Sequence, residues 1–122
     1  MPHPDWLYDR RSCQTCVKAR ADCHTRGVSA AEVVNAAKTR LGPADALALL
    51  AGIDAVIATR GRKVVRFDLA GDRPDDETLL RHLIGPSGNL RAPTMRVGRV
   101  LVVGHDAAVY AEVLGDERPG PS

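Results

Sequence analysis

The sequence predicts one α/β domain with a mixed central sheet flanked by helices. Short runs rich in Val and Ile alternate with Ala- and Leu-rich stretches that Gly, Pro or Asp bracket, which is a pattern of alternating strands and helices. The chain has 122 residues, the length of one domain, and its 44% hydrophobic and 26% charged residues are typical of a globular protein. We therefore expect a single domain over residues 1–115 and a polar, disordered tail over residues 116–122.

The first strand and the first helix are expected on either side of a polar turn. Residues 5–8 (DWLY) form a short apolar run with two aromatics, which predicts a strand. The turn that follows offers Ser12 as a helix cap. Residues 14–26 contain no Gly or Pro, and Gly27 follows where a helix C-cap is expected. These signals predict a helix of about three turns.

The middle of the chain predicts a strand, a helix and a hairpin. The stretch AEVVN within residues 28–35 predicts a second strand. Pro43 and Gly52 bracket the apolar stretch ALALLAGI and predict a helix between them. Two β-branched runs, residues 56–59 and 64–69, flank Arg-Gly-Arg and predict a hairpin, with one helix-to-strand irregularity as the alternative.

The last third predicts a helix, a second hairpin and a final helix. Within residues 72–85, acids precede an apolar stripe that ends at Gly, and acids at the start of a helix suit its dipole. Residues 95–97 and 100–103 flank Gly-Arg and predict a tight hairpin in the main sheet. Asp106 is expected to cap the helix formed by AAVYAEVL.

Charge and hydropathy narrow the range of partners and compartments. Lys and Arg total 17 against 15 Asp and Glu, and this balance argues against nucleic acid or an anionic membrane as the main partner. No apolar run approaches the roughly 20 residues of a transmembrane helix, and the first residues lack the apolar middle of a signal peptide. We expect a cytoplasmic monomer that binds neither nucleic acid nor membrane.

All three cysteines of the chain lie between residues 13 and 23, and the first two form a Cys-x-x-Cys pair. If Cys13 begins the helix, backbone N–H groups and the helix dipole stabilise its thiolate; cysteines at such positions have pKa values of about 3.5–7.5 rather than about 8.5. Arg10 and Arg11 add to this positive field. Cys13 is then the nucleophile, and Cys16, one turn further on, resolves the mixed disulfide.

A zinc site is the alternative use of these thiols, with Cys13, Cys16, Cys23 and His24 as four ligands. Cys23 lies about 10 Å along the helix from Cys16, whereas sulfurs that share one zinc lie within about 4 Å of each other. The same separation excludes a disulfide between Cys16 and Cys23 in an intact helix. We expect no metal site. We expect Cys23 to be a buried small hydrophobe, with a redox role as its alternative.

Two stretches, DWLYDRRSCQTCVKARADC and GNLRAPTMRVGRVLVVGHDAAVYAEVL, resemble the arsenate-reductase-like branch of the thioredoxin and glutaredoxin superfamily. The similarity runs from Asp5 to Leu114 and is closest to a bacterial group in which some members carry selenocysteine at the position of Cys13. It implies a thioredoxin-like fold with an inserted helical and hairpin segment. It also implies no bound cofactor, with reducing equivalents from glutathione or thioredoxin.

The resemblance also implies the other half of the site. Pro93 matches a cis-proline that makes the backbone of Ala92 face the active sulfur and pair with a bound peptide or glutathione. Spacing alone would favour an ordinary trans proline. Arg91 precedes by one residue the position where arsenate reductases carry an oxyanion-binding arginine, so it is either an anion or thiolate contact or a solvated side chain. With Thr15, these residues form the expected substrate-binding set.

Other polar and aromatic residues are expected to have structural roles. None of the four histidines is assigned a catalytic role; for His105, a role as a cap or surface residue and a role as a proton carrier are equally open. Trp6 and Tyr8 are expected in the core. A basic group is expected on the exposed face of the first hairpin, with a docking surface for an acidic partner as the alternative; its members are Arg60, Arg62, Lys63 and Arg66.

The sequence therefore predicts a thiol-disulfide oxidoreductase that acts on an oxidised thiol. The chain has neither a dinucleotide-binding glycine motif nor a flavin motif, so its electrons are expected from the thioredoxin or glutathione system. Two alternatives stay open: reduction of arsenate or another small oxyanion by Cys13, and a non-enzymatic redox-sensing module.

Overall fold

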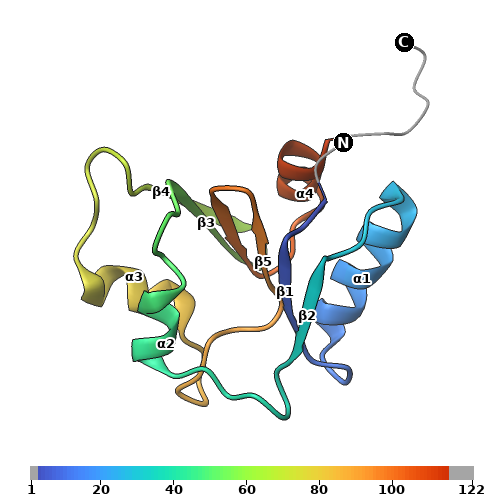
Figure 1. The fold of residues 1–122 in the computed structure, drawn as a ribbon, viewed down its shortest axis with the longest axis horizontal. Helices are drawn as coiled ribbons and strands as arrows, with labels where there is room; N and C mark the ends of the chain where they lie inside the picture. The colour runs from blue at the N-terminus through green and yellow to red at the C-terminus, as the bar shows by residue number, and fades with distance from the viewer. Residues whose placement is uncertain (1–2, 116–122) are drawn as a thin grey trace.

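A computed structural model describes residues 3–115 as an open, six-stranded sheet with helices on both faces (Figure 1). In chain order the elements are β1 (Trp6–Asp9), α1 (Gln14–Arg26), β2 (Glu32–Asn35), α2 (Pro43–Ala48), β3 (Ala55–Arg60), β4 (Lys63–Asp68), α3 (Asp76–Leu83), β5 (Thr94–Val97), β6 (Val100–Val103) and α4 (Ala107–Leu114). The strand order is β2-β1-β5-β6-β3-β4. Strands β1 and β2 are parallel, as are β3 and β6, and the other pairs are antiparallel. The predicted α/β class with a mixed sheet is confirmed.

Both predicted hairpins form, each around a two-residue turn. Arg60 pairs with Lys63 across the β3–β4 turn, where Gly61 has a φ of 59°. Val97 pairs with Val100 across the β5–β6 turn, where Gly98 has a φ of 60°. These positive φ values fit the turns that close two-residue hairpins and favour glycine. The alternative of one irregular segment between β3 and β4 is therefore wrong.

Helix α1 spans the predicted residues 14–26, but its N-cap lies one residue later than expected. Ser12 lies within a turn closed by the Cys13 N–H and the Arg10 carbonyl oxygen, 3.2 Å apart. Cys13 is the N-cap, with extended backbone, and its Sγ accepts the Cys16 N–H at 3.4 Å. The prediction of Ser12 as the cap is wrong because the turn delays the first helical residue, and a thiol occupies the position that a hydroxyl usually fills.

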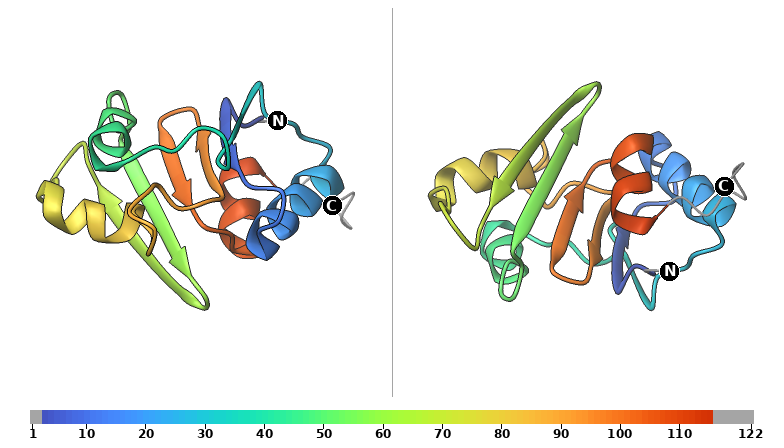
Figure 2. Two further views of the ribbon diagram at one scale, coloured as in Figure 1. Left: turned by 90° about the horizontal axis from the view of Figure 1, so that it is seen from below. Right: turned by 90° about the horizontal axis from the view of Figure 1, so that it is seen from above.

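Two apolar layers lie on opposite faces of the sheet (Figure 2). Helices α1 and α4 cover one face, with Ala19, Cys23 and Tyr110 against Leu7 and Met95. Helices α2 and α3 cover the other face through a second set of buried side chains, among them Ala46, Leu79, Leu83, Trp6 and Tyr8. The predicted core positions of Trp6 and Tyr8 are confirmed, and Cys23 is a buried core residue, as predicted.

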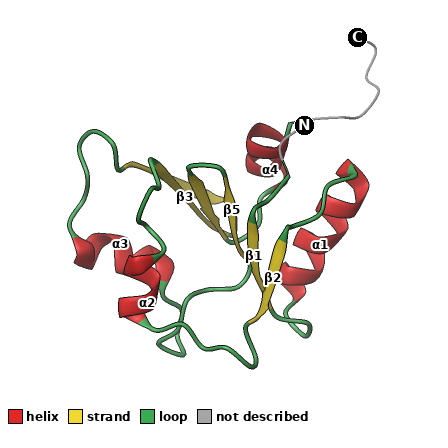
Figure 3. Cartoon of the chain, viewed as in Figure 1, coloured by secondary structure: helices red, strands yellow, loops and turns green. Residues whose placement is uncertain are grey.

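Three loops meet at one edge of the sheet, where β1 and β2 end (Figure 3). They connect β1 to α1, β2 to α2, and α3 to β5. Parallel strands bring their carboxyl ends to the same edge, which is where loops between strands and helices can form a binding site.

Between residues 3 and 115 no helix is long and apolar enough to cross a membrane. The predicted disordered tail lies outside the described residues.

The buried hydroxyl of Tyr110 predicts a stabilising substitution. Tyr110 is fully buried, and its hydroxyl has no hydrogen-bond partner among the described residues. An unsatisfied buried polar group costs about 1–3 kcal/mol. We expect Tyr110→Phe to raise the free energy of unfolding by about 1 kcal/mol in urea denaturation. Tyr8→Phe is the matched control, because the Tyr8 hydroxyl makes two hydrogen bonds and its loss should be destabilising. A less stable Tyr110→Phe protein would contradict this account.

Candidate functional site

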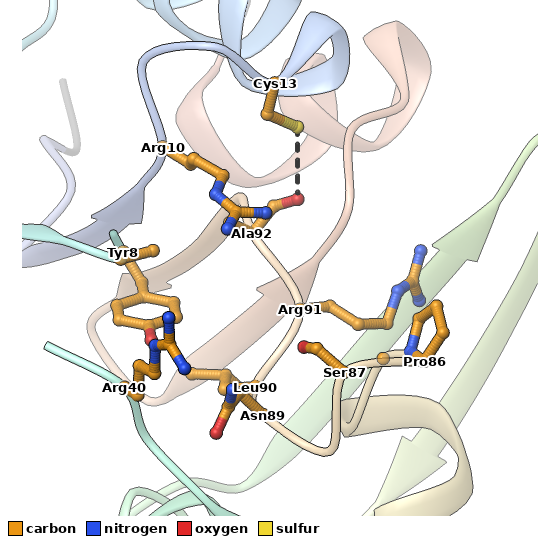
Figure 4. Close-up of a pocket in the computed structure, with 12 residues that line it drawn as sticks. Tyr8, Arg10, Cys13, Arg40, Pro86, Ser87, Asn89, Leu90, Arg91 and Ala92 are labelled. Atoms are coloured by element: carbon orange, nitrogen blue, oxygen red, sulfur yellow. Dashed lines mark hydrogen bonds between the residues drawn. The ribbon is translucent and has the colours of Figure 1, made fainter. Parts of the chain in front are cut away.

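The Cys13 thiol lies at the edge of a cavity of about 330 Å³ (Figure 4). The cavity walls come from the ends of β1 and β2 and from the loop before β5. Its lining residues are Tyr8, Arg10, Cys13, Ala36, Arg40, Gly85, Pro86, Ser87, Asn89, Leu90, Arg91 and Ala92. Cys13 is partly exposed, and its Sγ lies 3.7 Å from the Ala92 carbonyl oxygen, to which the thiol donates. The structure thus brings together Cys13 and Ala92, which are 79 residues apart in the chain.

The Cys16 thiol is less accessible than the Cys13 thiol. Cys16 is fully buried, and its Sγ accepts the Arg10 N–H at 3.4 Å. The pKa of Cys16 is raised from 9.0 to about 12, mainly by burial; the Arg10 N–H lowers it, and the neighbouring Cys13 sulfur contributes to the rise as a hydrogen-bond partner and as a charge. All three cysteines are free thiols in this structure. The site therefore pairs an accessible thiol with a shielded one that holds its proton.

The segment before β5 supplies the wall opposite Cys13. The Ala92–Pro93 peptide bond is cis, as the resemblance implied. Pro93 is buried, and its carbonyl oxygen accepts the Gly104 N–H at 2.7 Å. The Thr94 hydroxyl donates to the Arg91 carbonyl oxygen at 2.6 Å. These contacts hold the backbone of Ala92 beside the sulfur.

Arg91 and Thr15 lie differently from what the sequence suggested. The Arg91 guanidinium donates to the carbonyl oxygens of Thr59 at 2.7 Å and His82 at 3.4 Å. Burial lowers the pKa of Arg91, and the charge of Arg60 lowers it further. Arg91 lines the cavity, but its guanidinium points away from Cys13 (Figure 4), so it is neither a solvated side chain nor a thiolate contact. Thr15 is exposed on α1 and does not line the cavity.

Arg40 is the cavity residue that sequence reasoning missed. It is exposed, lies in the loop after β2 and lines the same cavity as Cys13 and Arg10. The available signal was topological: a cation shortly after a strand parallel to β1 comes to the edge of the sheet where α1 begins. With Arg91 the cavity has three arginines, and no Asp or Glu is among its lining residues. The cavity therefore attracts anions.

An ion pair behind the cysteine loop ties β1 to α1. Arg20 Nη1 lies 2.6 and 2.8 Å from the two carboxylate oxygens of Asp9, which is only 9% exposed. Arg20 Nη2 also donates to the Arg11 carbonyl oxygen at 3.2 Å. These bonds cross the loop that carries Cys13, so they fix the loop relative to the helix.

The other candidate residues lie away from the cavity. His105 Nε2 lies 2.8 Å from Asp22 Oδ2 where α1 meets α4. The alternative that His105 is a cap or a surface residue is wrong, because Asp106 caps α4. Arg66 is exposed, as predicted, and pairs with Glu112 through two contacts of 2.7 Å. Arg60, Arg62 and Lys63 are exposed on the hairpin. Within residues 3–115 no three His, Cys, Asp or Glu side chains are grouped as metal ligands.

The buried thiols predict a loss of stability in alkali. Burial raises the pKa of Cys16 to about 12 and that of Cys23 to about 11, from 9.0. Above pH 9 the unfolded chain releases thiol protons that the folded protein keeps, so the free energy of unfolding is constant below pH 9 and falls above it. The slope is about 1.4 kcal/mol per pH unit for each thiol between pH 9 and pH 10, above which the buried Tyr110 hydroxyl, whose pKa is also raised by burial, contributes too. Urea denaturation at several pH values measures this slope, and the slope contributed by the thiols should be halved in Cys23→Ala. A free energy of unfolding that does not change with pH in the unmodified protein would contradict the burial of both thiols.

Comparison of the chain with protein-family models, with curated proteins and with solved structures finds no match. The structure itself places an accessible thiol at a helix N-terminus, a second thiol one turn away, and a cavity lined by three arginines beside them.

Proposed function

We propose that the protein is a thiol-disulfide oxidoreductase in which Cys13 attacks the substrate and Cys16 resolves the intermediate. The observation that carries this proposal is the asymmetry of the two thiols. Cys13 caps α1, lines a cavity and contacts the Ala92 carbonyl, whereas Cys16 is buried and protonated. An accessible sulfur at a helix N-terminus is suited to attack, and a shielded sulfur one turn away is suited to resolution.

The reaction proceeds in two balanced exchanges. The Cys13 thiolate attacks one sulfur of a disulfide, forms a mixed disulfide, and releases the other half as a thiolate that takes up a proton. Cys16 then loses its proton and attacks Cys13 Sγ, which forms the Cys13–Cys16 disulfide and releases the second thiol. Two electrons pass from the cysteine pair to the substrate. Two glutathione thiols or a thioredoxin dithiol restore the pair.

The mixed disulfide itself helps to activate Cys16. Two of the causes that raise the pKa of Cys16 come from the Cys13 sulfur, as a hydrogen-bond partner and as a charge. The charge contribution is lost and the hydrogen bond is weakened when Cys13 Sγ is bonded to substrate, because a disulfide sulfur carries no negative charge. Resolution is therefore easier once the first exchange has occurred, and Cys16 remains protonated before it.

The strand order supports a thioredoxin-like fold, and the free thiols support a cytoplasmic location. Strands β2-β1-β5-β6, with α1 after β1 and α4 after β6, have the order we expect for a thioredoxin-like core, and the β3–β4 hairpin is then the insertion. We place the reaction in the cytoplasm, because reducing compartments keep clustered thiols free for catalysis. The resemblance to the arsenate-reductase-like branch agrees with this assignment.

Disulfide reduction by the purified protein tests the proposal. Insulin and a small synthetic disulfide serve as substrates, with either glutathione and glutathione reductase or thioredoxin and thioredoxin reductase as donor, and NADPH consumption is recorded. We expect turnover with at least one donor. Absence of turnover with both donors and both substrates would reject the proposal.

Oxyanion reduction is the second candidate, and the three arginines of the cavity favour it. A guanidinium binds tetrahedral oxyanions and carboxylates equally well through its planar fork. If the protein reduces arsenate, addition of arsenate should cause the protein to consume the thiols of the donor system, whereas insulin and the small synthetic disulfide should not be reduced. The same NADPH assay with arsenate in place of the disulfide distinguishes the two candidates.

A further inference from the structure

We propose that the cavity selects disulfides that carry a negative charge a few atoms from the sulfur, and that Arg40, positioned by the Tyr8 hydroxyl, recognises this charge. The inference rests on the proposed function, because it names the substrate class of the same site. It assigns Tyr8 a positioning role in addition to its place in the core.

The positive charge of the cavity is not neutralised by the residues around it. Arg10 and Arg40 form no ion pair with any residue between 3 and 115, and Arg91 donates to two uncharged carbonyl groups. No acidic side chain lines the cavity. A concave site lined by one sign of charge concentrates ligands of the opposite sign. The three guanidinium groups therefore favour a substrate that brings its own negative charge.

The three arginines do not occupy equivalent positions (Figure 4). The Arg91 guanidinium is bonded to backbone carbonyls and points away from the thiol. Arg10 lies close to Cys13 and Ala92. Arg40 lies farther from Cys13, beside the Tyr8 ring and Asn89. A substrate whose sulfur reacts at Cys13 therefore reaches Arg40 with its far end, and a cavity of about 330 Å³ accommodates a small molecule.

The Tyr8 hydroxyl holds the backbone on both sides of Arg40. It donates to the Thr39 carbonyl oxygen at 2.6 Å and accepts the Leu41 N–H at 3.2 Å. The Tyr8 ring is 1% exposed, so this anchor is rigid. The Leu41 carbonyl oxygen in turn accepts the Leu90 N–H at 2.6 Å, which joins this wall to the loop before β5.

The two hydrogen bonds of the Tyr8 hydroxyl fix the backbone from which the exposed Arg40 side chain extends. Arg40 is free to adjust its guanidinium, but its Cα cannot leave the cavity edge while both flanking peptide groups are bonded to Tyr8. Pre-organisation of this kind lowers the entropy lost when a charged ligand binds. Tyr8 is therefore a positioning residue that acts through Arg40.

A series of small disulfides that differ in charge tests the inference. The substrates are 3,3′-dithiodipropionate as dianion, 2-hydroxyethyl disulfide as neutral compound and cystamine as dication, and each kcat/KM is divided by the rate of the same disulfide with free dithiothreitol. We expect the dianion to exceed the neutral compound by about tenfold, and cystamine to be the poorest substrate. Arg40→Ala should reduce the dianion-to-neutral ratio about tenfold, mainly through KM. Arg62→Ala, an exposed arginine outside the cavity, is the matched control.

Tyr8→Phe separates positioning from general stability. It retains the ring, and we expect it to lower the dianion-to-neutral ratio several-fold; a purely structural role would reduce turnover of all three disulfides by the same factor. Equal normalised kcat/KM values for the three disulfides, unchanged in Arg40→Ala, would overturn the inference while the proposed function stands. Absence of turnover both of these three disulfides and of insulin would overturn the proposed function.

Alkylation of Cys13 gives a second readout that does not depend on turnover. The ratio of its rates with iodoacetate and with iodoacetamide should exceed the ratio for free cysteine and should fall in Arg40→Ala. An unchanged ratio in Arg40→Ala would count against Arg40 as the charge-recognising residue, whether or not the protein reduces disulfides.

Discussion

Replacement of Cys13 by serine should abolish disulfide reduction, with a loss in kcat/KM on the order of a thousandfold or more. A serine hydroxyl is not ionised at neutral pH and forms no disulfide, so neither exchange takes place. The fold should be retained, because serine is itself a favoured N-cap and can accept the Cys16 N–H that Cys13 Sγ accepts now. NADPH-coupled turnover and urea denaturation measure the two effects.

Ser12→Ala is the control for this substitution. Ser12 precedes Cys13 but lies in the turn and not among the cavity residues, so its loss should leave turnover near that of the unmodified protein. Retained turnover in Cys13→Ser would show that another thiol attacks the substrate, and the assigned roles would then be wrong.

Replacement of Cys16 by serine should stop the reaction at the mixed disulfide. The buried hydroxyl still accepts the Arg10 N–H but cannot attack Cys13 Sγ, so the substrate remains attached to Cys13. We expect turnover of insulin to fall by on the order of a hundredfold and mass spectrometry to find the adduct on Cys13 alone. Adducts on Cys23, or undiminished turnover, would contradict a resolving role for Cys16.

The elements of the fold were predictable because their signals are local. The α1 boundaries follow from a stretch without Gly or Pro and from Gly27, whose φ of 71° is a left-handed C-cap. The two hairpins follow from β-branched runs on either side of a single Gly. The exact cap of α1 was missed because the turn between Arg10 and Cys13 depends on a backbone hydrogen bond, and the sequence does not encode that bond in a recognisable pattern.

The sequence predicted only those parts of the cavity whose residues lie close together in the chain. Cys13 and Cys16 are close in sequence, so their relation follows from helix geometry. The place of Arg91 depends on the carbonyl oxygens of Thr59 and His82, which come from other elements of the fold. Arg40 reaches the site because β2 is parallel to β1 and because Tyr8 bonds the peptide groups around it. Contacts at such separations follow from the strand order rather than from any local pattern.

Under the proposed function, the sulfur that caps α1 would couple helix formation to electron transfer. Cys13 Sγ accepts the Cys16 N–H in this structure, and a Cys13 thiolate would accept it more strongly than the uncharged sulfur of a Cys13–Cys16 disulfide. Stabilisation of the first turn of α1 by the cap is therefore stabilisation of the reduced protein. A dithiol whose reduced form is stabilised has a higher reduction potential. Under the proposed function, a stronger helix cap, a property usually assigned to folding, would make this cysteine pair a weaker reductant of its substrate.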